Sequence, residues 1–152
     1  MTRATRDKIQ WVIDIEEIKM LMSKYCHGID KRNEKMFMSI WSDDAHYVLP
    51  RGEGHGIDQI RTLVHAVWDQ VSLCHHHISN PVIDIDGDTA AVQADVFYFR
   101  MTEDGTAKLL SGSYTMEFVR SDGRWGMLRC EFSPFVSLSP LFAEATLGGQ
   151  EP

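Results

Sequence analysis

The spacing of apolar residues changes part-way along the chain, and this change constrains the fold more than any other feature. Over residues 14–30 and 57–71 apolar side chains recur at intervals of three and four, which is typical of amphipathic helices. After residue 71 the period becomes two, and turn signals at residues 86–88, 103–105 and 121–123 separate four long runs typical of strands. This order predicts an α+β fold, a cone-shaped barrel in which N-terminal helices pack in a strongly curved, mixed but mostly antiparallel sheet.

Shorter elements lie between these regions. We expect a second helical stretch at residues 34–41, a strand at 45–49 and a glycine-punctuated loop at 51–56. The 152 residues fit a single domain, with a core from about 13 to 135 and a tail at 137–152 that is partly docked.

Composition and charge exclude several classes of protein. The 15 basic and 22 acidic residues give a net charge of −7, with no basic run, so we expect neither a nucleic-acid partner nor an anionic membrane. No segment approaches the roughly 18 apolar residues of a membrane span, and the first twenty residues do not resemble a secretory signal. Three widely spaced cysteines, Cys26, Cys74 and Cys130, are expected to be reduced, so the sequence predicts a cytoplasmic protein.

Tyr25 and Asp30 are the first pair of candidate catalytic residues. Tyr25 lies within the apolar arc of the first helix, and Asp30 lies beside that arc near the end of the helix. Partial desolvation and the negative end of the helix dipole would raise the pKa of Asp30 and allow it to act as a base. Alternatively, Asp30 is an exposed turn residue paired with Lys31 or Arg32, and Tyr25 is an ordinary core aromatic.

Three consecutive histidines open the first long strand. Alternation places His75 and His77 on one face and His76 on the other, unless a bulge intervenes. If the face of Ile78 and Val82 is concave, His76 points into the cone, where a neutral imidazole could act as a general base. The alternative is a set of hydrogen-bonded histidines at a sheet edge.

A metal site is the competing interpretation of the histidines. His75 and His77 resemble the start of such a site, but it would need a third ligand in reach. Asp95, or His55 with Glu53, could supply it only through tertiary contact. We therefore expect no metal.

Charged residues within apolar strands are further candidates. Asp95, Arg100 and Arg129 must be either solvated outside the sheet or functional inside it. Parity places Arg129 on one face with Trp125 and Met127, so an interior Arg129 could bind an oxyanion or a carboxylate of a substrate.

Five motifs occur in order between about residues 13 and 135. They are Tyr25-x4-Asp30, Trp41-Ser42-Asp43-Asp44-Ala45, His76-His77-Ile78-Ser79-Asn80-Pro81, Asp86-Gly87-Asp88-Thr89-Ala90 and Asp122-Gly123-Arg124-Trp125. This ordered set resembles the SnoaL-like proteins of the nuclear transport factor 2-like superfamily. The resemblance implies the α+β barrel fold and is much less specific for a reaction.

Three enzyme families of that superfamily have similar patterns. The bile acid 7α-dehydratases use a tyrosine, an aspartate five residues later and a histidine that opens the first long strand, which Tyr25, Asp30 and His76 match. The hexachlorocyclohexane dehydrochlorinases look similar at the aspartate and histidine but have lysine in place of Tyr25. Scytalone dehydratases rely on further tyrosines and a second histidine with no counterpart that we can place here. The resembling enzymes are trimers, which implies a homotrimer.

From the residues and the resemblance together we expect a cofactor-free dehydratase or isomerase that acts on a small, apolar cyclic or aromatic molecule. His76 would be the general base and acid, Asp30 would orient it, and Tyr25 would polarise a carbonyl or protonate a leaving hydroxyl. The residues expected to bind substrate are Arg129, Trp41, Tyr47 and Phe97.

Three alternatives stay open at this point. The same barrel serves noncatalytic ligand-binding or assembly modules, and it also serves as the small subunit of aromatic-ring dioxygenases. The third is a metal-dependent enzyme that uses His75 and His77.

Overall fold

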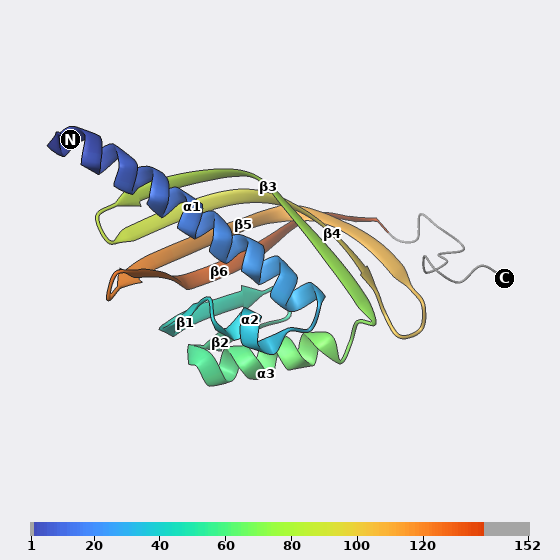
Figure 1. Ribbon diagram of the computed structural model, residues 1–152. Coiled ribbons are helices and arrows are strands. Elements are labelled where there is room, and N and C mark those ends of the chain that lie inside the picture. The colour runs from blue at the N-terminus through green and yellow to red at the C-terminus, as the bar shows by residue number, and fades with distance from the viewer. Residues whose placement is uncertain (1, 139–152) are drawn as a thin grey trace.

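Six strands form one curved sheet, and three helices pack against it (Figure 1). The computed structural model describes residues 2–138 of the chain. Its elements are α1 (Arg3–Asp30), α2 (Glu34–Met38), β1 (Trp41–Leu49), β2 (Gly52–His55), α3 (Gly56–Trp68), β3 (Leu73–Asp86), β4 (Thr89–Met101), β5 (Ala107–Ser121) and β6 (Arg124–Leu138).

The strand order is β2-β1-β6-β5-β4-β3. The pairing of β1 with β6 is parallel and the others are antiparallel, so the sheet is mixed. The predicted α+β cone is therefore confirmed, although β2 and β3 remain as edges and the sheet does not close. The predicted tail at 137–152 lies outside the described residues, apart from 137 and 138 at the end of β6.

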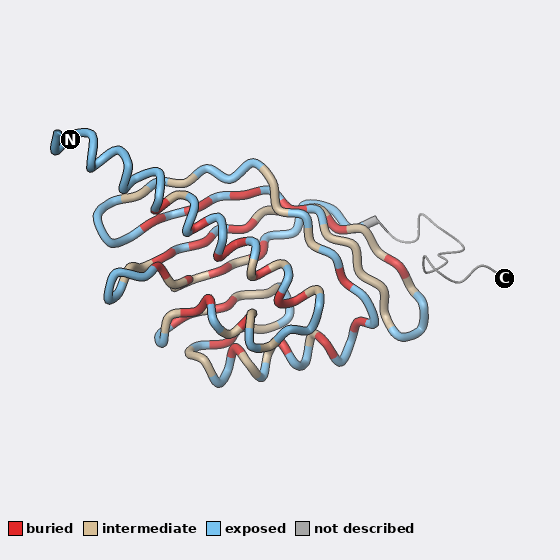
Figure 2. Tube along the Cα trace, in the orientation of Figure 1, coloured by how far each residue is buried: buried red, intermediate tan, exposed pale blue. Residues whose placement is uncertain are grey.

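Helix α1 begins well before the apolar stripe that predicted it. It starts at Arg3, where the side chain of Thr2 caps the helix by accepting a hydrogen bond from the Thr5 backbone N at 3.2 Å. Trp11 and Val12 are each 53% exposed, and Figure 2 shows this first part of the helix as exposed. Apolar periodicity detects the packed part of the helix, because only that part has a sheet to contact. No helix within residues 2–138 combines the length and apolar character needed to cross a membrane.

Gly28 holds α2 against the end of α1. The sequence places Gly28 close to the helix end, and the structure shows it inside the last turn. A Cβ at this position would lie 2.8 Å from the backbone of Phe37, which is fully buried in α2. Glycine therefore permits a contact that brings α2 directly against the segment of α1 that carries Tyr25 and Asp30.

The predicted loop at 51–56 contains a strand instead. Strand β2 occupies residues 52–55 and pairs with the end of β1. A Cβ at Gly54 would lie 2.9 Å from the backbone of Gln59, so glycine here allows α3 to pack closely on β2. Glycine residues in this segment permit close packing as well as tight turns, and the glycine content of the sequence does not distinguish the two roles.

Two β-bulges change the faces expected from strand alternation. In β3 the register shifts between Ser79 and Val82, at Asn80, whose φ is 52°. Val82 is consequently 70% exposed, while Ile83 packs against the core. The condition that Ile78 and Val82 share the concave face holds for Ile78 but not for Val82, because the bulge inverts the alternation after it.

The second bulge lies in β6 and reverses the face on which Arg129 was expected to lie. Phe118 pairs with Met127 and Glu117 pairs with Arg129, so Leu128 is the extra residue in β6. Met127 and Phe118 are buried in the core, and Arg129 lies on the opposite face with Glu117. The prediction of an interior Arg129 is wrong, since the parity argument assumed an uninterrupted strand.

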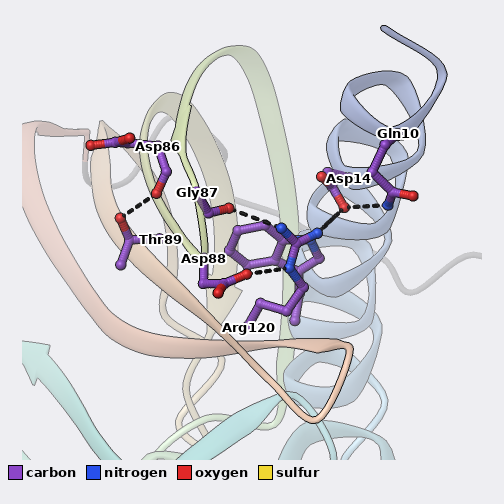
Figure 3. A network of polar contacts seen from close by, with 8 residues as sticks. Gln10, Asp14, Asp86, Gly87, Asp88, Thr89 and Arg120 are labelled. Carbon is purple, nitrogen blue, oxygen red and sulfur yellow. Dashed lines mark hydrogen bonds and ion pairs between the residues drawn. The ribbon is translucent and has the colours of Figure 1, made fainter. Parts of the chain in front are cut away.

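A polar network joins α1 to the far end of the sheet (Figure 3). Asp14 is 4% exposed and accepts hydrogen bonds from Arg120 Nη1 at 2.7 Å and Trp125 Nε1 at 3.1 Å. Arg120 also donates to Asp88 and to the carbonyl of Gly87 in the β3–β4 turn. These bonds tie α1 to β5, β6 and the β3–β4 turn at the end of the sheet away from Asp30.

Candidate active site

The end of α1 meets the start of β3 through a carboxylate and an imidazole. Asp30 Oδ1 lies 2.5 Å from His76 Nδ1, and Asp30 Oδ2 accepts a hydrogen bond from the His76 backbone N at 2.8 Å. The two side chains are 9% and 6% exposed. Because an ionised carboxylate only accepts, His76 Nδ1 carries the proton and Nε2 of the neutral ring is the basic atom.

Backbone contacts hold the end of α1 in place. Trp68 Nε1 donates to the Ile29 carbonyl at 2.8 Å, and Arg32 Nη2 donates to the carbonyls of Trp68 and Val71 at 2.9 and 2.6 Å. The unpaired carbonyls of a helix C-terminus need such partners. These bonds fix Asp30 relative to α3 and to the start of β3.

The predicted rise in the pKa of Asp30 is wrong. Burial raises this pKa, but the hydrogen bonds from the ring and the backbone N–H of His76 outweigh burial, so the pKa of Asp30 lies below its ordinary value. The sequence argument included burial and the helix dipole but had no means of including His76. Asp30 therefore stays ionised near neutral pH and is suited to orient the imidazole.

Aromatic rings lie on two sides of the imidazole. The ring of Tyr98 stacks on His76 with centroids 4.7 Å apart and an interplanar angle of 7°, and Tyr25 lies edge-on with centroids 6.1 Å apart. Asp30 and these rings leave the imidazole little freedom to turn. No partner of Nε2 is present among the described residues.

Three buried tyrosine hydroxyls meet at the end of the Tyr25 side chain. The hydroxyl of Tyr25 lies 2.8 Å from that of Tyr47 and 3.1 Å from that of Tyr114. Two hydrogen bonds among three hydroxyls use two of their three protons, so one proton remains to be donated to a bound molecule. Burial raises the pKa of all three tyrosines, which keeps them neutral and able to donate.

A cavity of about 440 Å³ joins the tyrosines to His76. Tyr25, Tyr47 and Tyr114 form its fully buried inner part, and Tyr98 and His76 line it further out. Its volume is typical of small-molecule sites. Of the candidates expected from sequence, Tyr25, Tyr47, His76 and Arg100 lie in its wall.

Asp30 lies on the other side of His76. It lines a separate groove of about 450 Å³ between α1 and β3, together with His76 and the exposed His75 and His77. We expected Tyr25, Asp30 and His76 to line one cavity with His75 and His77 pointing away from it. This expectation holds for Tyr25 and His76, and His75 and His77 are not in the cavity wall. It is wrong for Asp30, whose carboxylate lies in the groove and reaches the cavity only through the imidazole.

Three of the expected substrate-binding residues lie elsewhere. Trp41 is buried behind the cavity, packed against Tyr25 with ring centroids 6.5 Å apart. Phe97 is 53% exposed and alternates with the buried Val96 on β4, so it faces outward. Arg129 is bound on the outer face, where it donates to His46 Nδ1 at 2.7 Å and to Glu131 at 2.7 Å.

The cavity wall contains residues that sequence reasoning did not select. Tyr98 and Tyr114 were not singled out, and neither were Arg51 and Lys108. The alternation of apolar residues along β4 and β5 could have identified both tyrosines, because each lies on the same strand face as buried neighbours. Arg51 follows Pro50 in a turn and carries no such signal.

Potential metal ligands form two clusters within residues 2–138, and neither includes His75, His77 or Asp95. The first cluster is Asp30, Cys74 and His76. Burial raises the pKa of the Cys74 thiol to about 12, so the thiol is protonated and is a weak ligand. All three cysteines of the chain are free.

The second cluster is His46, Glu53 and His55 on the outer face of β1 and β2. Arg129 donates to His46 Nδ1, so the neutral ring must carry its proton on Nε2, where it bonds to Glu53 at 2.9 Å. That proton occupies the nitrogen that a metal would need. The contacts of this cluster therefore fit a hydrogen-bond network better than a metal site.

The sequence matches the model of the SnoaL-like domain over residues 10–131. The chain belongs to the SnoaL-like domain family. No curated protein sequence matches it. Solved structures are nevertheless similar to it over almost the whole chain.

Two of these structures are hexachlorocyclohexane dehydrochlorinases. A type 2 enzyme is 22% identical, with a TM-score of 0.89 over 94% of this SnoaL-like chain and 99% of the other. A type 3 enzyme from Novosphingobium barchaimii is 24% identical, with a TM-score of 0.86 over 92% and 99%. A scytalone dehydratase-like protein from Novosphingobium aromaticivorans is 19% identical, with a TM-score of 0.77 over 93% and 97%. At these identities the likeness shows the fold.

Proposed function

We propose that this SnoaL-like domain is a lyase or isomerase that removes a proton from a small, largely apolar cyclic or aromatic molecule. The proposal rests on the His76 imidazole, which is bound by Asp30 through Nδ1 and borders a cavity that ends in three buried tyrosine hydroxyls. The fold shared with dehydrochlorinases and with a scytalone dehydratase-like protein supports the same class of reaction.

His76 Nε2 takes a proton from a substrate carbon next to an activating group. The electron pair of the broken C–H bond forms a double bond, and a leaving group on the adjacent carbon departs with its own bonding pair. The imidazolium formed in this step is stabilised by the ionised Asp30. If the leaving group is a hydroxyl, it departs as water with a proton from the tyrosine cluster or from the imidazolium.

In an isomerisation the same proton abstraction gives an enolate. The spare proton of the Tyr25–Tyr47–Tyr114 cluster is donated to the developing oxyanion, and the imidazolium returns its proton at another carbon. Each positioned acid, base or donor contributes typically 10²–10⁴ in rate, so the substrate must itself have an activated C–H bond.

The test is kinetic, after screening hydroxylated or halogenated cyclic compounds and unsaturated ketones for turnover. His76→Ala and Asp30→Asn should each lower kcat/KM by about 10²-fold or more, and the double variant should lose about as much as His76→Ala alone, because the two residues act as one unit. His75→Ala and His77→Ala are matched controls on the same strand that leave the cavity wall unchanged.

Additive losses from Asp30→Asn and His76→Ala, or full turnover by His76→Ala, would contradict the dyad. Binding of small molecules without turnover by the wild type would favour a noncatalytic ligand-binding module instead.

A further inference from the structure

The outer part of the cavity is lined by cations. Arg51 lies in the turn after β1, Arg100 in β4 and Lys108 in β5, and all three are more exposed than the tyrosines at the inner end. The chain has 22 acidic and 15 basic residues, yet the described residues of the cavity wall include no Asp or Glu. The local charge is therefore opposite in sign to the net charge of the protein.

Arg100 is the most informative of these residues. Its Nε is buried and has no hydrogen-bond partner among the described residues, and no ion pair within residues 2–138 involves Arg51, Arg100 or Lys108. Burying a donor of a charged group without a partner is costly. A hydrogen-bond acceptor in the cavity would satisfy this donor, and an acceptor with negative charge would also offset the charge of the guanidinium.

The register of the sheet brings two of the charges together. Arg100 on β4 is directly opposite Lys108 on β5, and both share the inner face with Tyr98. Like charges directly opposite each other destabilise a sheet. Arg100 is two residues from Tyr98 on the same face of β4, and Arg51 lines the same cavity. Burial raises the pKa of Tyr98, and the charges of Arg100 and Arg51 oppose this rise. Since Tyr98 stacks on His76, Tyr98 lies between the imidazole and Arg100 along this face of the sheet.

We propose that the substrate is an amphiphilic anion, whose single carboxylate, sulfate or phosphate group binds Arg100 together with Arg51 and Lys108, and whose apolar ring extends toward Tyr25 and His76. This inference rests on the proposed function, because it names the substrate class of the same cavity. It assigns to Arg100 the anion contact that sequence parity had assigned to Arg129.

Binding of two probes of nearly equal shape tests the inference. The Kd of 2-naphthoate and of the neutral 2-naphthamide is measured by calorimetry with the wild type. We expect naphthoate to bind at least about tenfold more tightly, the typical effect of one charge-assisted hydrogen bond. Arg100→Met should remove most of this preference and leave the Kd of naphthamide within about threefold. Naphthyl sulfate and naphthyl phosphate then determine which anion binds best.

Arg124→Met is the matched control, because it makes the same change in net charge at an exposed site outside the cavity. It should leave both Kd values unchanged, and thermal unfolding verifies that each variant is folded. Equal affinity of the wild type for both probes, binding of neither at millimolar concentration, or an unchanged preference in Arg100→Met would overturn the inference.

The two proposals fail separately. His76→Ala should keep the preference for naphthoate, because the cations are intact, whereas the proposed function is tested by loss of turnover in that variant. A preference for the anion without any dependence of turnover on His76 would leave an anion-binding module.

Discussion

Asp14 is a charged side chain that folding buries almost completely, and its three donors come from α1, β5 and β6. Burial raises its pKa, but the hydrogen bonds from Trp125 and Gln10 and the charge of Arg120 outweigh burial, so the pKa lies below its ordinary value of 3.8. A carboxylate with a lowered pKa in the folded state stabilises the protein above its unfolded pKa. This stabilisation is lost as the pH falls through the folded pKa.

We expect Asp14→Asn to lower the free energy of unfolding at pH 7 by about 1.5–3 kcal/mol, the value of a hydrogen bond to a charged group. Below about pH 4 the wild type should lose stability more steeply than the variant. Urea unfolding between pH 3 and 7 measures both effects. Asp88→Asn is the control, because Asp88 also binds Arg120 but is 73% exposed. The same acid dependence in Asp14→Asn and the wild type would contradict this explanation.

Among the contacts between secondary-structure elements, the packing of α2 against α1 depends on Gly28. Ala is favoured over Gly inside a helix by about 1 kcal/mol. At position 28, however, the added Cβ would lie 2.8 Å from the backbone of Phe37, which cannot move without displacing α2. Overpacking of this kind costs typically 1–3 kcal/mol.

Gly28→Ala should therefore lower the free energy of unfolding by roughly 1 kcal/mol, despite the better helix propensity of Ala. Ser23→Ala on the exposed side of α1 should change it by less than about 0.5 kcal/mol. Chemical denaturation of the wild type and the two variants measures these changes in the free energy of unfolding. Stabilisation by Gly28→Ala would show that α2 moves away easily.

The bulges in β3 and β6 show how elements depend on their neighbours. His76 precedes the irregularity at Asn80, so simple alternation from the start of β3 predicts its face. Arg129 follows the extra residue Leu128, and alternation fails there. A bulge is an extra residue in one strand relative to the strand paired with it. The sequence of one strand alone therefore does not show where a bulge forms.

The assembly of the whole molecule stays a prediction. The resemblance to trimeric enzymes implies a homotrimer, and the sheet carries exposed large apolar side chains at Val82, Phe97 and Phe135 that contact with another copy could cover. Light scattering in solution should then give three times the 17.4 kDa mass of one chain. A mass equal to one chain would contradict the trimer.

The curved sheet brings together residues that are far apart in the chain, and this determines how much could be predicted. By itself the sequence determined the α+β class, the positions of Tyr25 and Asp30 near the end of a helix and the placement of His76 on the strand face opposite that of His75 and His77. Each of these depends on local periodicity, which sterics and hydrogen bonding impose within a few residues.

Only the tertiary structure decided which charges face the cavity and how Asp30 ionises. Arg100 and Lys108 become neighbours through the pairing of β4 with β5, and Arg129 turns outward through a bulge. The pKa of Asp30 is lowered because His76, remote in sequence, donates two hydrogen bonds to it against the effect of burial. Electrostatic energies depend on distance in space and on exclusion of water, and neither quantity can be derived from the order of residues along the chain.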